Sequence, residues 1–310
     1  MGKSSMQQIP IIILMVAILL TGCTPANNLF VQAFATEIVD TMTPEPTPTL
    51  PTPTPSSTPT PTLTPTPVPP TPTPTITLTP TPRTVYNEPG SVYAPILLYH
   101  HVQGEVSSNR YEVSIPDFRA QMLTLKELGY TAIPLSVFLQ ALLDGGELPE
   151  KPVVITFDDG HQSVYDNAFP IMQEFGFPGV FYIVANRIYG SPNFVGIDQL
   201  EEMIAAGWEI GSHGYSHLDM TLNHDLADKE IRESKLDLEW ALSSKVLTFA
   251  YPFGTIDQFI ANKVSNSGYK AGMGLGKSKS HTWNNLFYLE RIEIYASYTL
   301  EDFRNILEGE

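Results

Sequence analysis

Short apolar runs alternate with amphipathic segments along the chain from about residue 84 onward. The apolar runs are rich in β-branched and aromatic residues and predict strands at residues 96–102, 153–157, 180–184, 208–212, 246–251 and 269–273. Helical spacing of apolar positions predicts helices at residues 117–128, 136–143, 163–175, 197–206, 226–242 and 255–267. This alternation predicts an α/β fold of parallel strands joined by right-handed crossovers. The number of units favours a barrel-like arrangement with fewer than eight units, with chemistry at the carboxyl ends of the strands.

The N-terminal residues follow the order of a secretory signal, with Lys3 before an apolar run over residues 9–20 and small residues before Cys23. This run is too short for an ordinary transmembrane helix. The tetrapeptide Leu20-Thr21-Gly22-Cys23 resembles a bacterial lipoprotein signal, in which the cysteine receives a diacylglycerol and becomes the new N-terminus. We therefore expect a signal peptide over residues 1–22 and lipidation of Cys23, which would anchor the chain in the membrane through two acyl chains. The alternative is a buried cysteine in an uncleaved membrane anchor.

A Thr/Pro repeat separates this signal from the rest of the chain. Residues 44–82 hold 16 of the 28 prolines, a composition that disfavours folding and favours extended polyproline II. At about 3.1 Å per residue, this segment would span on the order of 120 Å if fully extended. We interpret residues 23–83 as a lipid-anchored, disordered linker and residues 84–310 as the catalytic domain. A disordered tail without a spacer role has the same composition, and glycosylation of the threonines stays open.

Composition and charge narrow the class of protein. The chain has 17 Lys and Arg against 33 Asp and Glu, a formal charge of −16 that argues against binding nucleic acid. The single cysteine excludes an internal disulfide framework and every multi-cysteine metal site. The length and the proline-poor remainder predict one folded domain, which we expect to be monomeric.

Polar side chains follow several predicted strands. Asp158 and Asp159 come directly after one strand and before Gly160, whose backbone freedom allows the turn that would make both carboxylates converge. Alone, this sequence is more typical of a simple turn. His213 and His217 follow another strand with a spacing that brings both imidazoles to one side. Two histidines and a carboxylate are typical of a hydrolytic or Lewis-acid metal site.

Three motifs in this order resemble those of the polysaccharide deacetylase family with the NodB homology domain, carbohydrate esterase family 4. They are Thr156-Phe157-Asp158-Asp159-Gly160, Ser212-His213-Gly214-Tyr215-Ser216-His217 and Tyr251-Pro252-Phe253-Gly254. The resemblance covers about residues 96–294 and implies a distorted (β/α)7 barrel. It also implies metal-dependent removal of N-acetyl, less often O-acetyl, groups from a glycan.

The resemblance also implies roles for single residues. Asp158 would be the general base, and Asp159, His213 and His217 would hold a divalent metal, either zinc or, as alternatives, cobalt or nickel. The backbone N–H of Phe253 would face the developing oxyanion. We place Phe253, Tyr251 and Arg291 at the substrate.

The sequence departs from the common family pattern in two places. No histidine follows residue 294, so we assign the general acid to His100, as in the poly-N-acetylglucosamine deacetylase branch. His101 is expected on the opposite side of the same strand, with a structural role, although the two histidines could be exchanged. Ala250 stands where many members have an arginine that pairs with the base. Arg291 is either its substitute or an ordinary ion-pair residue.

For the remaining histidines and aromatic residues, the sequence gives weaker indications of a functional role. His161, His224 and His281 are interpreted as satisfied or solvated side chains, with His281 in a loop. Tyr215, Phe253 and Trp283 are candidates to stack on sugars or to pack in the rim of the site.

The leading hypothesis is a metal-dependent hydrolase, lipid-anchored at the cell surface, that removes N-acetyl groups from an N-acetylglucosamine-containing polysaccharide. The alternatives are an inactive glycan-binding protein on the same fold and an O-acetyl xylan esterase. An iron oxygenase, which uses the same ligand types, is a further alternative that turnover without oxygen would exclude. From residue 84 onward, 15 basic and 30 acidic residues give a net charge of −15. This charge favours neutral or cationic glycans over anionic ones, but peptidoglycan, poly-N-acetylglucosamine, chitin and acetylated xylan all stay open.

Overall fold

A computed structural model describes residues 83–107 and 109–309, all of which belong to the chain's second unit, Pro74–Glu310. The predicted signal peptide, Cys23 and nearly all of the predicted linker lie outside the described residues. Among those that are described, no helix combines the length and the apolar character needed to cross a bilayer.

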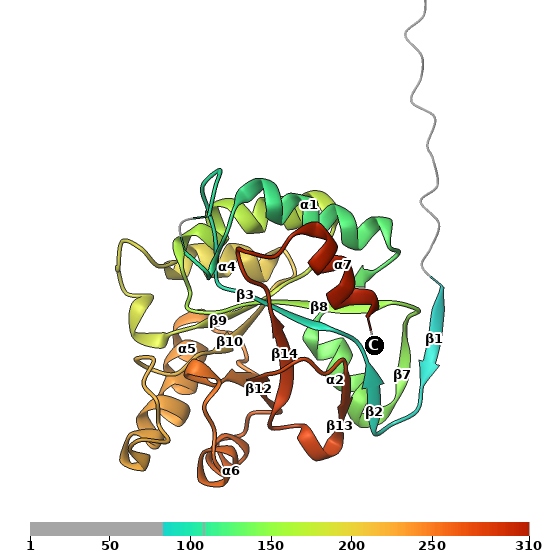
Figure 1. Cartoon of the computed structure of the whole chain (residues 1–310). Coiled ribbons are helices and arrows are strands. Elements are labelled where there is room, and N and C mark those ends of the chain that lie inside the picture. Colours follow the sequence, from blue (N-terminus) through green and yellow to red (C-terminus); the bar gives the residue numbers. More distant parts are fainter. Residues whose placement is uncertain (1–82, 108, 310) are drawn as a thin grey trace, which may run out of the picture. The chain divides into compact units, whose positions relative to one another are not determined.

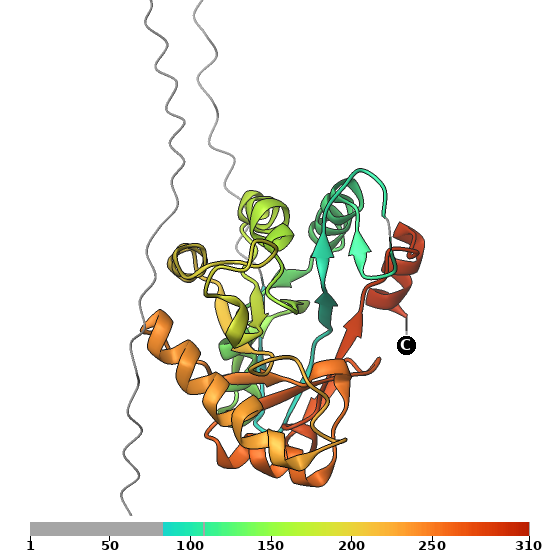
Figure 2. The same cartoon turned by 90° about the vertical axis from the view of Figure 1, so that its left-hand side faces the viewer.

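The centre of the domain is a closed barrel of parallel strands (Figures 1 and 2). Its strands are β3 (Ile96–Tyr99), β8 (Pro152–Phe157), β9 (Val180–Ile183), β10 (Glu209–Ser212), β11 (Thr248–Ala250), β12 (Ala271–Leu275) and β14 (Leu289–Glu293). They follow the spatial order β3-β14-β12-β11-β10-β9-β8, and pairing of β3 with β8 closes the ring. The short strand β6 (Thr131–Ala132) adds to the start of β8. The predicted (β/α)7 barrel is therefore confirmed.

Alternation of side chains along the strands divides the core in two. Ile96 and Val154 belong to an apolar cluster that also contains residues of β9, β11 and β12, so this cluster fills the barrel. Leu97 and Ile155 belong to a second cluster that packs against the surrounding helices. The sequences of β3 and β8 are nearly continuous apolar runs because both faces of these strands are buried.

The helices lie around the outside of the strands in Figure 2. They are α1 (Ile115–Glu127), α2 (Leu135–Asp144), α3 (Phe169–Phe175), α4 (Ile197–Ala205), α5 (Ser234–Leu242), α6 (Gln258–Asn266) and α7 (Leu300–Glu308). Wider π turns at Val164–Ala168 and Asp228–Glu233 precede α3 and α5. Ser114 caps the start of helix α1, because its hydroxyl accepts a hydrogen bond from the Asp117 backbone N–H. Phe138 and other apolar residues of α2 join the cluster inside the barrel, so α2 covers the amino ends of the strands.

Short strand pairs also lie at the amino ends of the barrel strands. Strand β1 (Thr84–Asn87) pairs with β7 (Gly146–Pro149), which directly precedes β8. Strand β2 (Ser91–Tyr93), which directly precedes β3, pairs with β13 (Ser280–Thr282). The described chain therefore begins at the end of the barrel that lies opposite the carboxyl ends of the strands (Figure 1).

Two predictions about individual elements are wrong. The predicted strand 96–102 ends at Tyr99, and His101 begins a separate strand, β4 (His101–Val102), that pairs with β5 (Glu112–Val113). His281 is not in a loop, because it lies on β13 with a fully buried side chain. Its Nε2 donates a hydrogen bond to the Ala94 carbonyl over 3.1 Å. Its Nδ1 has no hydrogen-bond partner among the described residues.

The burial of His281 predicts a loss of stability in acid. Burial lowers the pKa of His281 to about 4 from an ordinary value of 6.5. Below pH 6.5, His281 is therefore protonated in the unfolded chain but stays neutral in the folded protein. The free energy of unfolding consequently decreases as the pH falls from 6.5 toward 4. Between pH 7.5 and 5, this residue should remove about 2 kcal/mol from the free energy of unfolding. Urea unfolding of His281→Gln should lack this part of the pH dependence; equal pH dependence in the two proteins would contradict the assignment.

Candidate functional site

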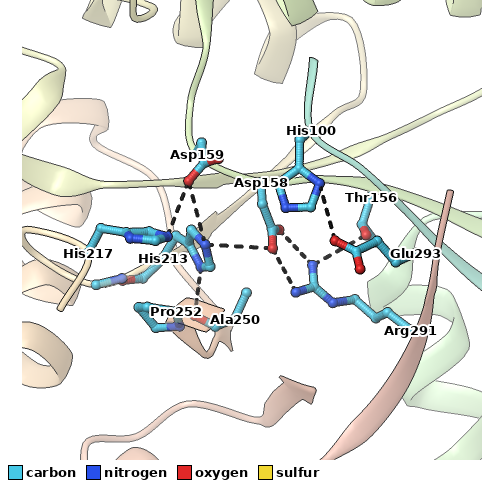
Figure 3. A network of polar contacts seen from close by, with 12 residues as sticks. His100, Thr156, Asp158, Asp159, His213, His217, Ala250, Pro252, Arg291 and Glu293 are labelled. Carbon is cyan, nitrogen blue, oxygen red and sulfur yellow. Dashed lines mark hydrogen bonds and ion pairs between the residues drawn. The ribbon is translucent and has the colours of Figure 1, made fainter. Parts of the chain in front are cut away.

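A cavity of 480 Å³ opens at the carboxyl ends of the barrel strands. It is lined by residues of all three motifs, by the segment after β3 and by β14. Figure 3 shows that Asp158, Asp159, His213 and His217 approach one another there, with Arg291 and His100 beside them. The tertiary structure thus brings together the predicted base, acid and metal ligands.

Asp158 is a buried carboxylate held by an arginine on a neighbouring part of the barrel. Arg291 donates two hydrogen bonds to it, Nη1 to Oδ1 over 2.6 Å and Nη2 to Oδ2 over 2.8 Å, and both residues are almost fully buried. Burial by itself raises the pKa of Asp158, but the Arg291 charge, helped by His213, outweighs burial and lowers this pKa to about 2. Asp158 is therefore an acceptor at neutral pH. Of the two interpretations of Arg291, the geometry matches a partner of Asp158, and a contact of Arg291 with substrate stays a prediction.

A tight turn brings the second carboxylate to the same place. Asp159 and Gly160 both have left-handed backbone conformations, with φ values of 72° and 74°. As a result, His213 Nε2 lies 3.6 Å from Asp158 Oδ2 and 3.9 Å from Asp159 Oδ1. The turn predicted from the glycine makes the two adjacent carboxylates converge.

Asp159, His213 and His217 fit a divalent metal ion. One ligand atom from each residue lies within 4.8 Å of the other two. His213 Nδ1 donates a hydrogen bond to the Ala250 carbonyl over 2.8 Å, which leaves the Nε2 lone pair free toward the carboxylates. Burial, and then the neighbouring His213, lower the pKa of His217 to about 4, so this imidazole is neutral as metal ligation requires. Two nitrogen donors and one carboxylate suit a transition ion such as zinc.

The loop that carries both histidines is held by a buried glutamate that the sequence analysis missed. Glu230 is 1% exposed and accepts hydrogen bonds from the backbone N–H groups of Tyr215 and Ser216, over 3.0 and 2.9 Å, and from the Ser216 hydroxyl. On the other side of the loop, the Ala185 backbone N–H donates to the Gly214 carbonyl over 3.0 Å. A Cβ on Gly214 would lie 2.8 Å from Glu230 Oε2, so this close approach requires glycine. No local pattern marked Glu230, because it lies on the helical segment before α5.

Both histidines after β3 reach the cavity. His100 Nδ1 is buried, makes no hydrogen bond within residues 83–107 and 109–309, and lies 3.8 Å from Glu293 Oε1. His101 was expected on the opposite side of the strand; this is wrong, because the strand ends at Tyr99 and both imidazoles line the cavity. His101 stacks on His161 with ring centres 4.0 Å apart. Burial, and then His161, lower the pKa of His101 to about 4.

Glu293 is a second residue that the sequence analysis missed. It follows Arg291 by two positions, so both side chains of β14 line the cavity. Three of the five residues of Leu289–Glu293 are charged and they do not alternate with the apolar ones, so the local pattern did not indicate a strand.

Of the aromatic residues predicted at the site, Phe253 and Tyr251 line the cavity and Trp283 does not. Phe253 is 61% exposed at the cavity and its ring centre lies 4.6 Å from that of His217. Tyr251 lines the cavity, but its hydroxyl donates to the Phe287 carbonyl. Trp283 donates to the Leu142 carbonyl at the end of α2, and its ring lies against Gly90, so the prediction that it stacks on sugars or packs in the rim of the site is wrong.

Carboxylates and imidazoles gathered at the carboxyl end of a parallel barrel form a site suited to metal-assisted hydrolysis. Residues 145–272 match the family model described as polysaccharide deacetylase. The enzyme class expected from the motifs, a hydrolase of carbon–nitrogen bonds other than peptide bonds, is confirmed.

Relatives extend over much of the chain. The Bacillus subtilis protein YxkH is 25% identical over 216 residues, which cover 69% of this chain and 76% of YxkH. The poly-β-1,6-N-acetyl-D-glucosamine N-deacetylase of Staphylococcus epidermidis is 28% identical over 189 residues, which cover 56% of this chain and 65% of that protein.

Solved structures share the fold. The Streptococcus pyogenes deacetylase PplD, solved with acetate, superposes with a TM-score of 0.64 at 24% identity, covering 70% of this chain and 99% of PplD. IcaB from Ammonifex degensii superposes with a TM-score of 0.58 at 22% identity, covering 71% of this chain and 98% of IcaB.

Proposed function

We propose that this protein is a metal-dependent N-deacetylase of an extracellular glycan that contains N-acetylglucosamine. The observation that carries the proposal is the placement of an ionised, arginine-held Asp158 directly beside the three candidate ligands Asp159, His213 and His217. The name of the staphylococcal relative supports β-1,6-linked poly-N-acetylglucosamine as the substrate.

The side chains of the cavity have separate roles in amide hydrolysis. A divalent transition ion held by Asp159, His213 and His217 would polarise the acetyl carbonyl and acidify a water molecule. Asp158 accepts the proton of the attacking water, since it is ionised and cannot move away from Arg291. As the carbon–nitrogen bond breaks, His100 donates a proton to the departing amine, and Glu293 faces its Nδ1. The products are acetate and a free amino sugar.

Acetate release tests this proposal. Protein reconstituted separately with zinc, cobalt and nickel is offered β-1,6- and β-1,4-linked N-acetylglucosamine oligomers, peptidoglycan and acetylated xylan. We expect release from an N-acetylglucosamine oligomer that stops when the metal is chelated. Release only from xylan would instead indicate an O-acetyl esterase, and binding without release from any polymer would indicate a glycan-binding protein.

We also propose that Cys23 is lipidated and anchors the enzyme at the cell surface. The described chain begins beside β7, at the barrel end opposite the cavity, so a tether there would leave the cavity facing away from its attachment point. Replacing Cys23 by serine should move the protein from the membrane fraction to the medium or stop its maturation. Unchanged membrane fractionation would refute lipidation.

Glu230→Gln should weaken metal binding without touching a ligand. The amide oxygen can still accept from the two backbone N–H groups, which both contact Oε2. However, the amide carries no charge and presents NH2 in place of Oε1 to the Ser216 hydroxyl, so the loop with His213 and His217 is held less firmly. Replacing such an outer partner typically costs roughly 10–100-fold in metal affinity. Zinc affinity measured by competition with a chromophoric chelator checks this. Glu201→Gln, an exposed change on α4, is the matched control and should leave zinc affinity unchanged.

A further inference from the structure

Helix α5 presents an exposed tryptophan to solvent. Trp240 is 77% exposed and Leu236, one turn earlier, is 51% exposed. Glu233 and Asp237 have the same helical spacing, so the four side chains share one face. Together with Tyr215 they line a shallow hollow of 390 Å³, which we call the α5 surface.

The polar groups of the α5 surface are ordered. Tyr189 donates a hydrogen bond from its hydroxyl to Asp237 Oδ1 over 2.7 Å, which fixes the carboxylate while leaving its charge in place. Lys229 lies 4.6 Å from the Tyr215 ring centre and covers that ring. The open aromatic face of the hollow is therefore that of Trp240, with carboxylates on the same side of the helix. Exposed apolar side chains grouped in this way mark a binding surface.

The α5 surface adjoins the candidate active site. Tyr215 belongs to the loop between His213 and His217, whose side chains line the cavity, while Tyr215 itself lines the hollow. Glu230 joins the same loop to the helical segment that leads into α5. The loop therefore separates the cavity from the hollow that Trp240 lines.

We propose that the α5 surface binds a partly de-N-acetylated glucosamine glycan. This inference rests on the proposed function, which supplies that ligand: hydrolysis of each acetamide leaves an amine that takes up a proton near neutral pH. The C–H faces of β-linked pyranose rings are apolar and stack on an exposed indole, and an ammonium group is attracted both to the indole and to carboxylates. Glu233 and Asp237 supply the carboxylates beside Trp240.

Charge complementarity selects this occupant over the acetylated polymer. The substrate is neutral, whereas the product gains one positive charge for each sugar processed. From residue 84 onward, the net charge of −15 attracts such a polycation over a distance, and the effect weakens with salt. The α5 surface therefore retains a glycan after its first deacetylation and favours repeated reaction on the same chain.

Binding of defined oligosaccharides tests the proposal. The β-1,6-linked glucosamine hexasaccharide and its fully N-acetylated counterpart are titrated into the whole protein by calorimetry at low and moderate salt. We expect Trp240→Ala to weaken binding of the glucosamine hexasaccharide at least tenfold. The double change Glu233→Gln with Asp237→Asn should remove most of the salt dependence. Trp283→Ala, another exposed tryptophan but at the opposite end of the barrel, is the matched control and should bind like the wild type.

Three results would overturn the proposal: equal affinity of Trp240→Ala and wild type for the glucosamine hexasaccharide, an equal loss for the acetylated hexasaccharide, or a wild type that does not bind the glucosamine form. Acetate release by the wild type from the acetylated hexasaccharide is recorded separately. If release occurs and Trp240 has no effect on binding, the α5 surface is refuted and the proposed function stands. If release fails from this hexasaccharide and from every other N-acetylglucosamine polymer of the panel, the proposed function fails, whatever the binding result.

Discussion

Replacing Asp158 by asparagine is expected to lower the rate of acetate release roughly 10²–10⁴-fold, the range typical for loss of a general base. The neutral amide cannot accept the proton of the attacking water, although it fills nearly the same space beside His213. Zinc should still bind, because the candidate ligands Asp159, His213 and His217 are unchanged. The rate is measured per bound zinc on metal-reconstituted protein.

Asp159→Asn is the matched comparison, since it changes the neighbouring carboxylate in the same way but should lose zinc affinity as well as rate. Asparagine at position 158 also leaves the Arg291 charge buried without its counter-ion. The double change Asp158→Asn with Arg291→Leu removes both charges, and it should be as inactive as the single variant but more stable. A rate for Asp158→Asn above a tenth of the wild-type rate, with full zinc content, would refute Asp158 as the base.

The second large effect concerns stability. Arg291→Leu should lower the free energy of unfolding by about 3–5 kcal/mol, because it leaves the Asp158 carboxylate buried and unpaired. The Arg291 and Asp158 side chains are only 1% and 3% exposed, so water cannot replace the lost hydrogen bonds. Urea unfolding of the metal-free protein at pH 7 measures the change without a contribution from bound metal.

An exposed pair of the same geometry provides the control. Arg119 donates two hydrogen bonds to Glu174, but both side chains are about half exposed. Arg119→Leu should therefore leave the unfolding free energy almost unchanged, since solvent screens such a pair. In a double-mutant cycle, Asp158→Asn should recover much of the stability lost in Arg291→Leu. Equal effects of the Arg291 and Arg119 changes would show that burial does not strengthen the Asp158 pair.

Some of the site could be predicted because its residues are close in sequence. Asp158, Asp159 and Gly160 form one turn, and His213 and His217 lie on one loop, so local spacing alone indicated that they act together. The apolar runs of the buried strands β3 and β8 likewise revealed the barrel, since strands covered on both faces must be apolar.

The local sequence pattern did not reveal strand β14, the end of β3 or the burial of His281. Strand β14 carries charges that point into the cavity, so it did not look like a buried strand. The end of β3 at Tyr99 depends on pairing between β4 and β5, and this pairing places both His100 and His101 at the cavity. His281 looked solvated among lysines and serines, yet β2 pairs with its strand and buries it.

By itself, the sequence indicated the class of fold, the enzyme class and the candidate metal ligands, because these follow from apolar runs and from three short motifs, each continuous along the chain. Only the tertiary structure decided that Arg291 holds Asp158, that Glu293 faces His100, and that Glu230 supports the loop of His213 and His217. Arg291 and Asp158 are 133 positions apart. Contacts between such distant residues form only when β14 pairs with β3 and β3 with β8 to close the barrel, and no local periodicity encodes that closure.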